Sequence, residues 1–202
     1  MKLKSLAIAM LTLMMMAGLC MAQQSTEAEL MAGTDSVAGG IAFRRPMYSG
    51  YTKIGFSGVY ADDDDTKYQL GNARFVVGND TLSQGLSIEA GLQGIFGSAE
   101  EDDNTGDVGA IAFTARVGYL FPRRLVPIPL EIFGGFTYAP EPLSFIDLDE
   151  YKEINLGVGV HIIPNASIQL SYHSYEMKMD EDDDGEWTVD DDSIRLGLVM
   201  RF

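Results

Sequence analysis

An acidic stretch near the carboxyl end carries the residue spacing of a calcium-binding loop. Its candidate ligands are Asp180, Asp182, Asp184, Glu186 and Asp191. The first three alternate as loop positions one, three and five, and Gly185 follows where such loops turn sharply. Position twelve holds Asp191 where the longer, bidentate Glu is usual, and a run so rich in Asp matches the spacing easily. Two alternatives stay open, a specific calcium site and a solvated acidic loop, and weak collective binding of divalent cations is favoured.

A serine and a histidine have the spacing of a nucleophile and its base. Ser171 and His173 stand two residues apart, so they share one face of a strand. A hydrolase needs such a pair within reach of each other, which would allow a lipid-modifying enzyme. The shared face is expected to line the interior of a barrel, away from acyl chains, where the pair would join a hydrogen-bond network. We therefore expect no catalytic residues, no enzyme activity and no cofactor beyond weakly bound divalent cations such as calcium.

Charged residues recur at positions that would point into a barrel. The expected lumen charge network is Glu89, Arg116, Glu131, His161, His173 and Arg195. Glu89, Arg116 and Glu131 fall on three successive predicted strands, so they would pair across neighbouring strands. An eight-stranded barrel is only wide enough for side chains to fill it, and buried charges need partners or water. The sequence thus predicts a plugged interior.

The last ten residues, 193–202 (SIRLGLVMRF), show most clearly which elements would position these side chains. Ile194, Leu196 and Leu198 face one side of an extended chain, while Arg195 and Arg201 face the other. An apolar outer row behind a charged inner row is typical of a barrel wall with lipid outside and a polar lumen inside.

Eight segments of this kind follow residue 48. They are 50–61, 66–78, 82–96, 108–121, 128–139, 150–163, 165–178 and 193–202. Bacterial outer-membrane barrels use even strand numbers from eight upward. The predicted fold is therefore all-β, a transmembrane antiparallel up-and-down β-barrel of eight strands. Segment 66–78 is irregular because neither of its two rows is wholly apolar, and a β-bulge is expected there.

The connections between these segments sort by charge. The first, third, fifth and seventh, within 62–65, 100–107, 141–150 and 180–192, hold most of the 30 Asp and Glu residues. The second, fourth and sixth consist mainly of turn-forming residues. Such barrels have long loops outside and tight turns on the periplasmic side. We therefore expect acidic extracellular loops and both termini in the periplasm.

The amino-terminal residues predict export. Lys2 and Lys4 precede an apolar stretch at 6–19, and Cys20-Met21-Ala22 forms a cleavage site before Gln23. This divides the chain into a cleaved signal peptide at 1–22, a segment at 23–48 and a barrel at 49–202. The middle segment is either a periplasmic extension or an extra hairpin that would make ten strands. Eight strands are favoured because both halves of that hairpin are short.

A longer stretch of the sequence resembles a known family. It comprises Phe136–Ser144 (FTYAPEPLS), Ile146-Asp147, Glu150-Tyr151, the Gly157-Val158-Gly159 strand, the Asp-rich loop after Tyr60 and the final Phe202. These features are similar to those of the YfaZ family of bacterial outer-membrane barrels. The resemblance implies a location and a fold, and it carries over no activity and no catalytic residues.

The formal net charge of −16 excludes nucleic acid as a partner, because nucleic acid selects basic surfaces. The sequence predicts a small integral outer-membrane β-barrel with polyacidic loops, in a structural role or one that binds cations or a partner. Its expected partners are membrane lipid, lipopolysaccharide and divalent cations, while no protein partner can be named. The alternatives are a narrow pore for small solutes and the lipid-modifying enzyme.

Overall fold

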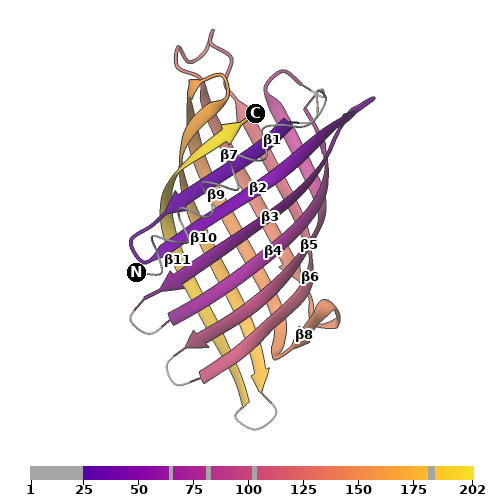
Figure 1. Ribbon diagram of the computed structural model, residues 1–202, viewed down its shortest axis with the longest axis vertical. Coiled ribbons are helices and arrows are strands. Elements are labelled where there is room, and N and C mark those ends of the chain that lie inside the picture. The colour runs from indigo at the N-terminus through magenta and orange to yellow at the C-terminus, as the bar shows by residue number, and fades with distance from the viewer. Residues whose placement is uncertain (1–24, 64–65, 81–82, 102–103, 182–184) are drawn as a thin grey trace.

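The computed structural model describes residues 25–63, 66–80, 83–101, 104–181 and 185–202, so the predicted signal peptide lies outside the described residues. One antiparallel sheet forms nearly all of this structure (Figure 1). Its strands are β1 (Ser25–Ala32), β2 (Ser36–Met47), β3 (Gly50–Asp62), β4 (Thr66–Asn79), β5 (Leu86–Glu101), β6 (Asn104–Leu120), β7 (Leu130–Ala139), β8 (Ser144–Ile146), β9 (Leu148–Ile163), β10 (Ala166–Glu181) and β11 (Gly185–Arg201). A single turn of 3-10 helix, η2 (Glu141–Leu143), precedes β8.

The sheet closes into a barrel of ten strands. The order β5-β4-β3-β2-β1-β11-β10-β9-β7-β6 is completed by a direct pairing of β5 with β6. The short β8 lies outside this ring and pairs only with β6. The prediction of eight strands is therefore wrong, and the ten-strand alternative describes the barrel.

The two strands that were not counted form the amino-terminal hairpin. β1 pairs with β2 on one side and with β11 on the other, from Glu27 opposite Arg201 to Ala32 opposite Leu196. Sequence periodicity was weak here because Gly39 and Gly40 have no side chain with which to show an inward or outward row. The backbone ladder runs through both glycines without a shift in register.

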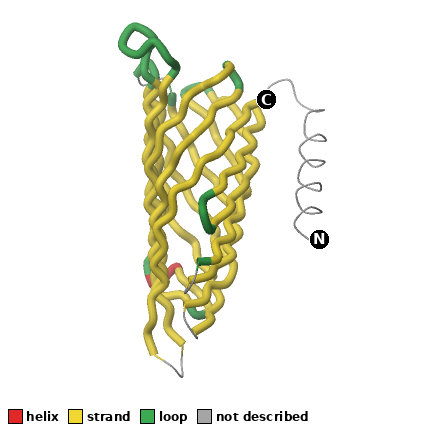
Figure 2. Tube along the Cα trace, turned by 90° about the vertical axis from the view of Figure 1, so that its left-hand side faces the viewer, coloured by secondary structure: helices red, strands yellow, loops and turns green. Residues whose placement is uncertain are grey.

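The two ends of the barrel differ in their connections. One end, here called the acidic end, carries the β1–β2, β3–β4, β5–β6, β7–β9 and β10–β11 connections. The opposite end, here called the terminal end, holds Ser25 and Phe202 together with the remaining connections. Figure 2 shows the strands tilting around one continuous wall, with the short helical turn η2 near the acidic end.

Apolar side chains cover the outside of the barrel between these ends. This belt includes Ile54, Phe56, Phe75, Leu92, Phe96, Ile111, Phe113, Phe136, Leu156, Leu170 and Leu196. The expected alternation places them there, and Phe113 and Leu196 remain 56% and 58% exposed. Among the described residues, no helix has the length and apolar character needed to cross a membrane.

Strand β4 keeps its register with both neighbours, so the bulge expected at 66–78 is not present. Register shifts occur instead between β9 and β10, at Ala166/Ser167 and at Lys178/Met179. The irregular pattern of β4 has another cause, because its inward row changes character along the barrel. Tyr68 and Leu70 are buried in an apolar layer, whereas Asn72 and Arg74 line a polar cavity.

That apolar layer fills the barrel at the acidic end. It comprises Val59, Ala61, Tyr68, Leu70, Ile95, Ala99, Val108, Ala110, Ala112, Ala139, Leu148, Tyr151, Tyr175, Met177, Met179 and Val189, none more than 6% exposed. We call this cluster the apolar plug. The charged residues that were expected to fill the interior lie instead in the remaining part of the lumen.

Candidate functional site

A cavity of about 280 Å³ opens at the terminal end of the barrel and is lined mainly by charged side chains. Most of these charges form ion pairs across its wall. Glu27 on β1 binds Arg201 on β11, with 2.8 Å between Oε2 and Nε. Glu131 on β7 lies 3.0 Å from the Nε2 atom of His161 on β9. We call this space the terminal cavity.

Two further pairs complete the wall of the terminal cavity. Arg44 binds Asp80 at the rim. Deeper inside, the Nζ atom of Lys53 on β3 lies 2.6 Å from Oε1 of Glu89 on β5, and thus reaches past β4. The Tyr51 hydroxyl donates a second hydrogen bond of 2.8 Å to the same oxygen. The other carboxylate oxygen of Glu89, Oε2, is buried and has no hydrogen-bond partner among the described residues.

Arg116 stands opposite Glu89 in the β5–β6 register. Its guanidinium carbon lies 4.3 Å from the centre of the Phe133 ring, a cation–π contact. The ring has room because residue 157 is glycine, where an added Cβ would come within 2.4 Å of the ring edge. No ion pair or hydrogen bond joins Arg116 to any other residue in the described part of the chain. Arg116 lines both the terminal cavity and a smaller cavity deeper in the barrel, and so stands between them.

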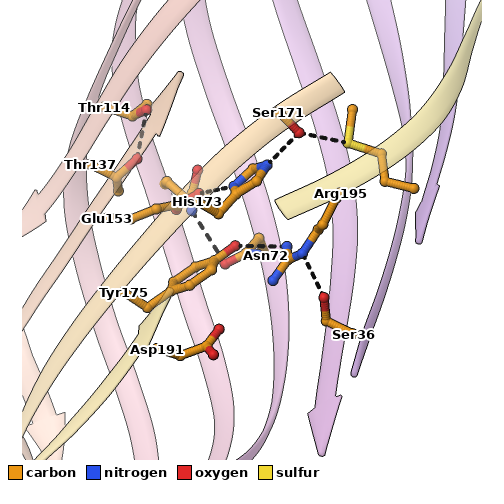
Figure 3. Close-up of polar contacts among 12 residues, drawn as sticks. Ser36, Asn72, Thr114, Thr137, Glu153, Ser171, His173, Tyr175, Asp191 and Arg195 are labelled. Carbon is orange, nitrogen blue, oxygen red and sulfur yellow. Dashed lines mark hydrogen bonds and ion pairs between the residues drawn. The ribbon is translucent and has the colours of Figure 1, made fainter. Parts of the chain in front are cut away.

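The second cavity, of about 90 Å³, lies halfway along the lumen. Arg195 is buried beside it, with 1% of its surface exposed. Its guanidinium donates hydrogen bonds of 3.0 Å to Ser36, 3.1 Å to Tyr175 and 3.1 Å to Tyr68. The Tyr68 hydroxyl in turn donates to Asp191 at 2.6 Å. This network, drawn in part in Figure 3, separates the mid-barrel cavity from the apolar plug.

Ser171, His173 and Glu153 lie in the same layer in the order of a nucleophile, a base and an acid (Figure 3). Ser171 Oγ is 3.1 Å from His173 Nε2. His173 Nδ1 is 3.7 Å from Glu153 Oε1, which is beyond hydrogen-bond distance. Ser171 is 2% exposed and is absent from the lining of the mid-barrel cavity, which His173 and Glu153 do reach. The arrangement therefore gives a substrate no path to the serine oxygen.

The six residues of the predicted lumen network all line the interior, but in two layers. Glu89, Arg116, Glu131 and His161 line the terminal cavity, while His173 and Arg195 belong to the mid-barrel layer. The expected ion pairs among Glu89, Arg116 and Glu131 are not formed within the described part of the chain. Glu89 binds Lys53 and Glu131 binds His161 instead.

Five charged residues of the terminal cavity were not predicted as members of this network, namely Glu27, Arg44, Lys53, Asp80 and Arg201. Lys53 shares an inward row with Gly55 and Ser57, so strict alternation along 50–61 would have found it. Arg201 stood in an inward row but had no predicted partner. That partner is Glu27, which lies in the hairpin whose assignment was left open.

The structure separates the candidate calcium ligands. Asp182 and Asp184 lie outside the described residues. Asp180 and Glu186 are directly opposite each other on β10 and β11, close to the tip of their hairpin. Asp191 is five residues further along β11, or about 17 Å at the usual rise of a strand, and it accepts the Tyr68 hydrogen bond. Within the described part of the chain, no three His, Cys, Asp or Glu side chains form a group that would hold a metal ion.

Beyond the apolar belt, the outer face of the acidic end carries ion pairs between neighbouring strands. Lys178 on β10 binds Glu150 on β9 at 2.6 Å, and Lys152 on β9 binds Glu176 on β10 at 2.8 Å. The hydrogen bond from Lys178 lowers the pKa of Glu150, and the same bond raises the pKa of Lys178. These pairs offset only part of the negative charge at this end.

Comparison with known proteins gives one family and several structural neighbours. Residues 3–202 match the family model described as YfaZ precursor. The NanC porin structure is 9% identical with a TM-score of 0.42, covering 88% of this chain and 98% of that one. The outer-membrane expressed OmpT of Vibrio cholerae is 10% identical with a TM-score of 0.39, covering 89% and 96%. The translocator domain of the autotransporter NalP from Neisseria meningitidis is 10% identical with a TM-score of 0.39, covering 100% and 98%. No curated protein sequence matches this chain significantly.

Proposed function

This chain belongs to the YfaZ family, and on that premise we propose that it is a small, closed β-barrel integral to the bacterial outer membrane, with a structural, cation-binding role. The apolar belt supports the membrane location, because a continuous apolar surface around a closed barrel is stable only in contact with hydrocarbon. The acidic end faces the outside and the terminal end faces the periplasm. Strands β10 and β11 extend beyond the apolar belt at the acidic end, and this extension supports the orientation.

The apolar plug is the observation on which the closed state depends. Met177, Met179 and Tyr151 are fully buried within it, and Tyr68 is 1% exposed. Water and ions would lose their hydrogen-bond partners on entering such a layer, at a cost of several kcal/mol for each unpaired group. A barrel filled in this way anchors and displays its hairpins rather than conducting solutes.

The displayed surface is negative and lies among the anionic phosphates of lipopolysaccharide, so like charges would repel each other. Divalent cations shared between acidic side chains and lipid phosphates would remove that repulsion. Carboxylates on the outer face of β10 and β11, such as Glu176 and Asp190, stand opposite each other in register and supply such positions. Several carboxylates and phosphates would share each bound cation, and the bound cations would exchange with those in solution.

Conductance in a planar lipid bilayer tests the closed state. The protein, refolded and inserted from detergent, should give no steady current above that of the bilayer alone. Sustained single-channel openings would overturn the proposal. Insertion must be verified in the same samples by the resistance of the folded barrel to protease, so that an absent current is not mistaken for absent protein.

A narrow pore is a second candidate, supported by the two polar cavities that meet at Arg116. It requires the apolar plug to move aside, and it predicts openings in the bilayer experiment above. A lipid-modifying enzyme is a weaker candidate, because Ser171 is closed off from the mid-barrel cavity. Lipid A of unchanged mass after incubation with the protein is the result expected here, whereas a mass change lost in Ser171→Ala would establish the enzyme.

A further inference from the structure

We propose that the terminal cavity is a binding site for a small zwitterion, a molecule in which a carboxylate stands beside a protonated amine. Arg116 would hold the carboxylate and Glu89 would accept hydrogen bonds from the amine. The proposal goes beyond the structural role given above and requires only that the barrel be folded.

The two binding groups are identified by the partners of the other charges. Around the terminal cavity, Arg44, Arg201 and His161 each have a carboxylate partner within the wall. Lys53 is bound to Glu89 through Oε1. What remains, among the described residues, is one buried carboxylate oxygen without a hydrogen-bond donor, Glu89 Oε2, and one guanidinium without a carboxylate partner, that of Arg116.

The surroundings hold both groups in place. The Glu89 side chain is only 10% exposed, and its Oε1 atom is fixed by Lys53 and by Tyr51. The guanidinium of Arg116 rests on the Phe133 ring, which leaves its N–H edges available. A buried carboxylate oxygen without a donor is costly, so a ligand that supplies an N–H group there would relieve a cost present in the empty site.

The relative position of the two groups selects the ligand class. Glu89 and Arg116 are directly opposite in antiparallel register, which places their Cβ atoms about 5 Å apart. Neighbouring positive and negative groups on the wall match a ligand in which the opposite charges are also neighbours, as in an α-amino acid. The planar guanidinium suits a carboxylate because it can donate two parallel hydrogen bonds.

The cavity admits a ligand of that size from the terminal end. Its volume of about 280 Å³ is several times the roughly 30 Å³ that one water occupies in the liquid. Ser25, Gly85 and Leu120 also line it, so its mouth lies among the connections of the terminal end. In the proposed orientation, the site would sample small molecules of the periplasm.

Isothermal titration calorimetry on the full-length folded protein in detergent micelles tests the proposal with three probes. L-Alanine carries both charges, acetate carries only the carboxylate, and methylammonium carries only the amine. L-Alanine should bind at least about tenfold more tightly than either single-charge probe, because each of those leaves one group of the site without a partner. Equal affinities for all three probes, or no binding of L-alanine, would overturn the proposal.

Two variants and two matched controls assign the contacts. Glu89→Gln should reduce the affinity for L-alanine to that for acetate, and Arg116→Gln should reduce it to that for methylammonium. Glu150→Gln and Lys178→Gln make the same changes of charge at the acidic end, and they should leave L-alanine binding unchanged. Unchanged binding in both cavity variants would contradict the assignment.

Two further measurements keep the test valid if a variant fails to fold, one on the variants and one on the unaltered protein. Folding of each variant is read from the shift in its electrophoretic mobility on heating. Independently, the methyl protons of L-alanine should show nuclear Overhauser contacts to the Tyr51 ring, which lines the terminal cavity. Contacts only to residues of the acidic end would refute the site. Single-channel openings with intact L-alanine binding would overturn the closed barrel while leaving this proposal standing.

Discussion

The guanidinium of Arg195 donates a hydrogen bond of 3.1 Å to the hydroxyl of Tyr68 across the lumen of the barrel. These residues belong to β11 and β4, which are separated in the sheet by β1, β2 and β3. Because Arg195 also bonds Ser36 and Tyr175, one buried cation connects the walls on opposite sides of the barrel. The polar lumen ends at this connection and the apolar plug begins.

Replacing the buried arginine should weaken the barrel. Arg195→Met removes the donor to three hydroxyl groups, and the loss should lower the free energy of unfolding by about 2 kcal/mol or more, since buried polar groups lose partners. Urea-induced unfolding in lipid vesicles measures the change. Arg45→Met, at an exposed position of β2, serves as the control and should change stability by no more than about 0.5 kcal/mol. Equal effects of the two changes would show that the Arg195 network contributes nothing specific.

Emptying the apolar plug should both destabilise the barrel and open it. Met177→Ala and Met179→Ala each remove a fully buried side chain, at a cost of about 2 to 5 kcal/mol in unfolding free energy. The double variant should also show ion currents that the original protein lacks, because water would then enter the vacated space. Met47→Ala removes the same side chain from a position that is 57% exposed, and it should change neither property. A stable, silent double variant would mean that the plug does not seal the lumen.

The class of fold and the outer surface could be predicted from the sequence, because lipid imposes one simple rule on every outward position. Ile111, Leu156 and Ile194 follow that rule, and all three lie on the outside. The amino-terminal hairpin escaped because its glycines show no row, although they do not interrupt the hydrogen-bond ladder. Strand number was therefore the weakest part of the prediction.

The interior could be predicted only in part, because its lining changes along the barrel from polar side chains to apolar ones. The inward rows of β4 and β10 change from polar to apolar on approaching the acidic end, as Asn72 gives way to Tyr68 and His173 to Met177. Alternation between apolar and polar residues cannot identify the inward row of a strand where both of its faces are apolar. Partners such as Lys53 and Glu89 lie two strands apart, a relationship set by the curvature of the closed wall and invisible in strand order.

In the ion pair between Glu150 and Lys178, the pKa of the Glu150 carboxyl group should lie below the ordinary value for glutamate. The hydrogen bond from Lys178 lowers the pKa of Glu150 from its usual 4.5. The stabilisation from this pair is therefore present above pH 4.5 and is lost as the pH falls through the lowered value. Lys178→Gln should raise the pKa of Glu150 toward 4.5, as measured by NMR titration of its side-chain carbon. Both groups are near the surface, so global stability should change little. A glutamate pKa that does not respond would show that the pair is not formed in solution.

Divalent cations should order the outer part of the β10–β11 hairpin. Glu176 and Asp190 are register partners on its outer face. Lys152 neutralises part of the charge of Glu176, and the negative charge that remains opposite Asp190 destabilises the strand pair. In vesicles that contain lipopolysaccharide, adding a chelator should speed amide hydrogen exchange in this hairpin, because the repulsion is no longer screened. The double variant Glu176→Gln, Asp190→Asn should exchange at one rate with or without the chelator. Asp35→Asn, an acid-to-amide change at the β1–β2 turn, should preserve the chelator response. If the chelator does not change the rate of amide hydrogen exchange in the unaltered protein, the acidic end is a solvated surface and divalent cations have no structural role there.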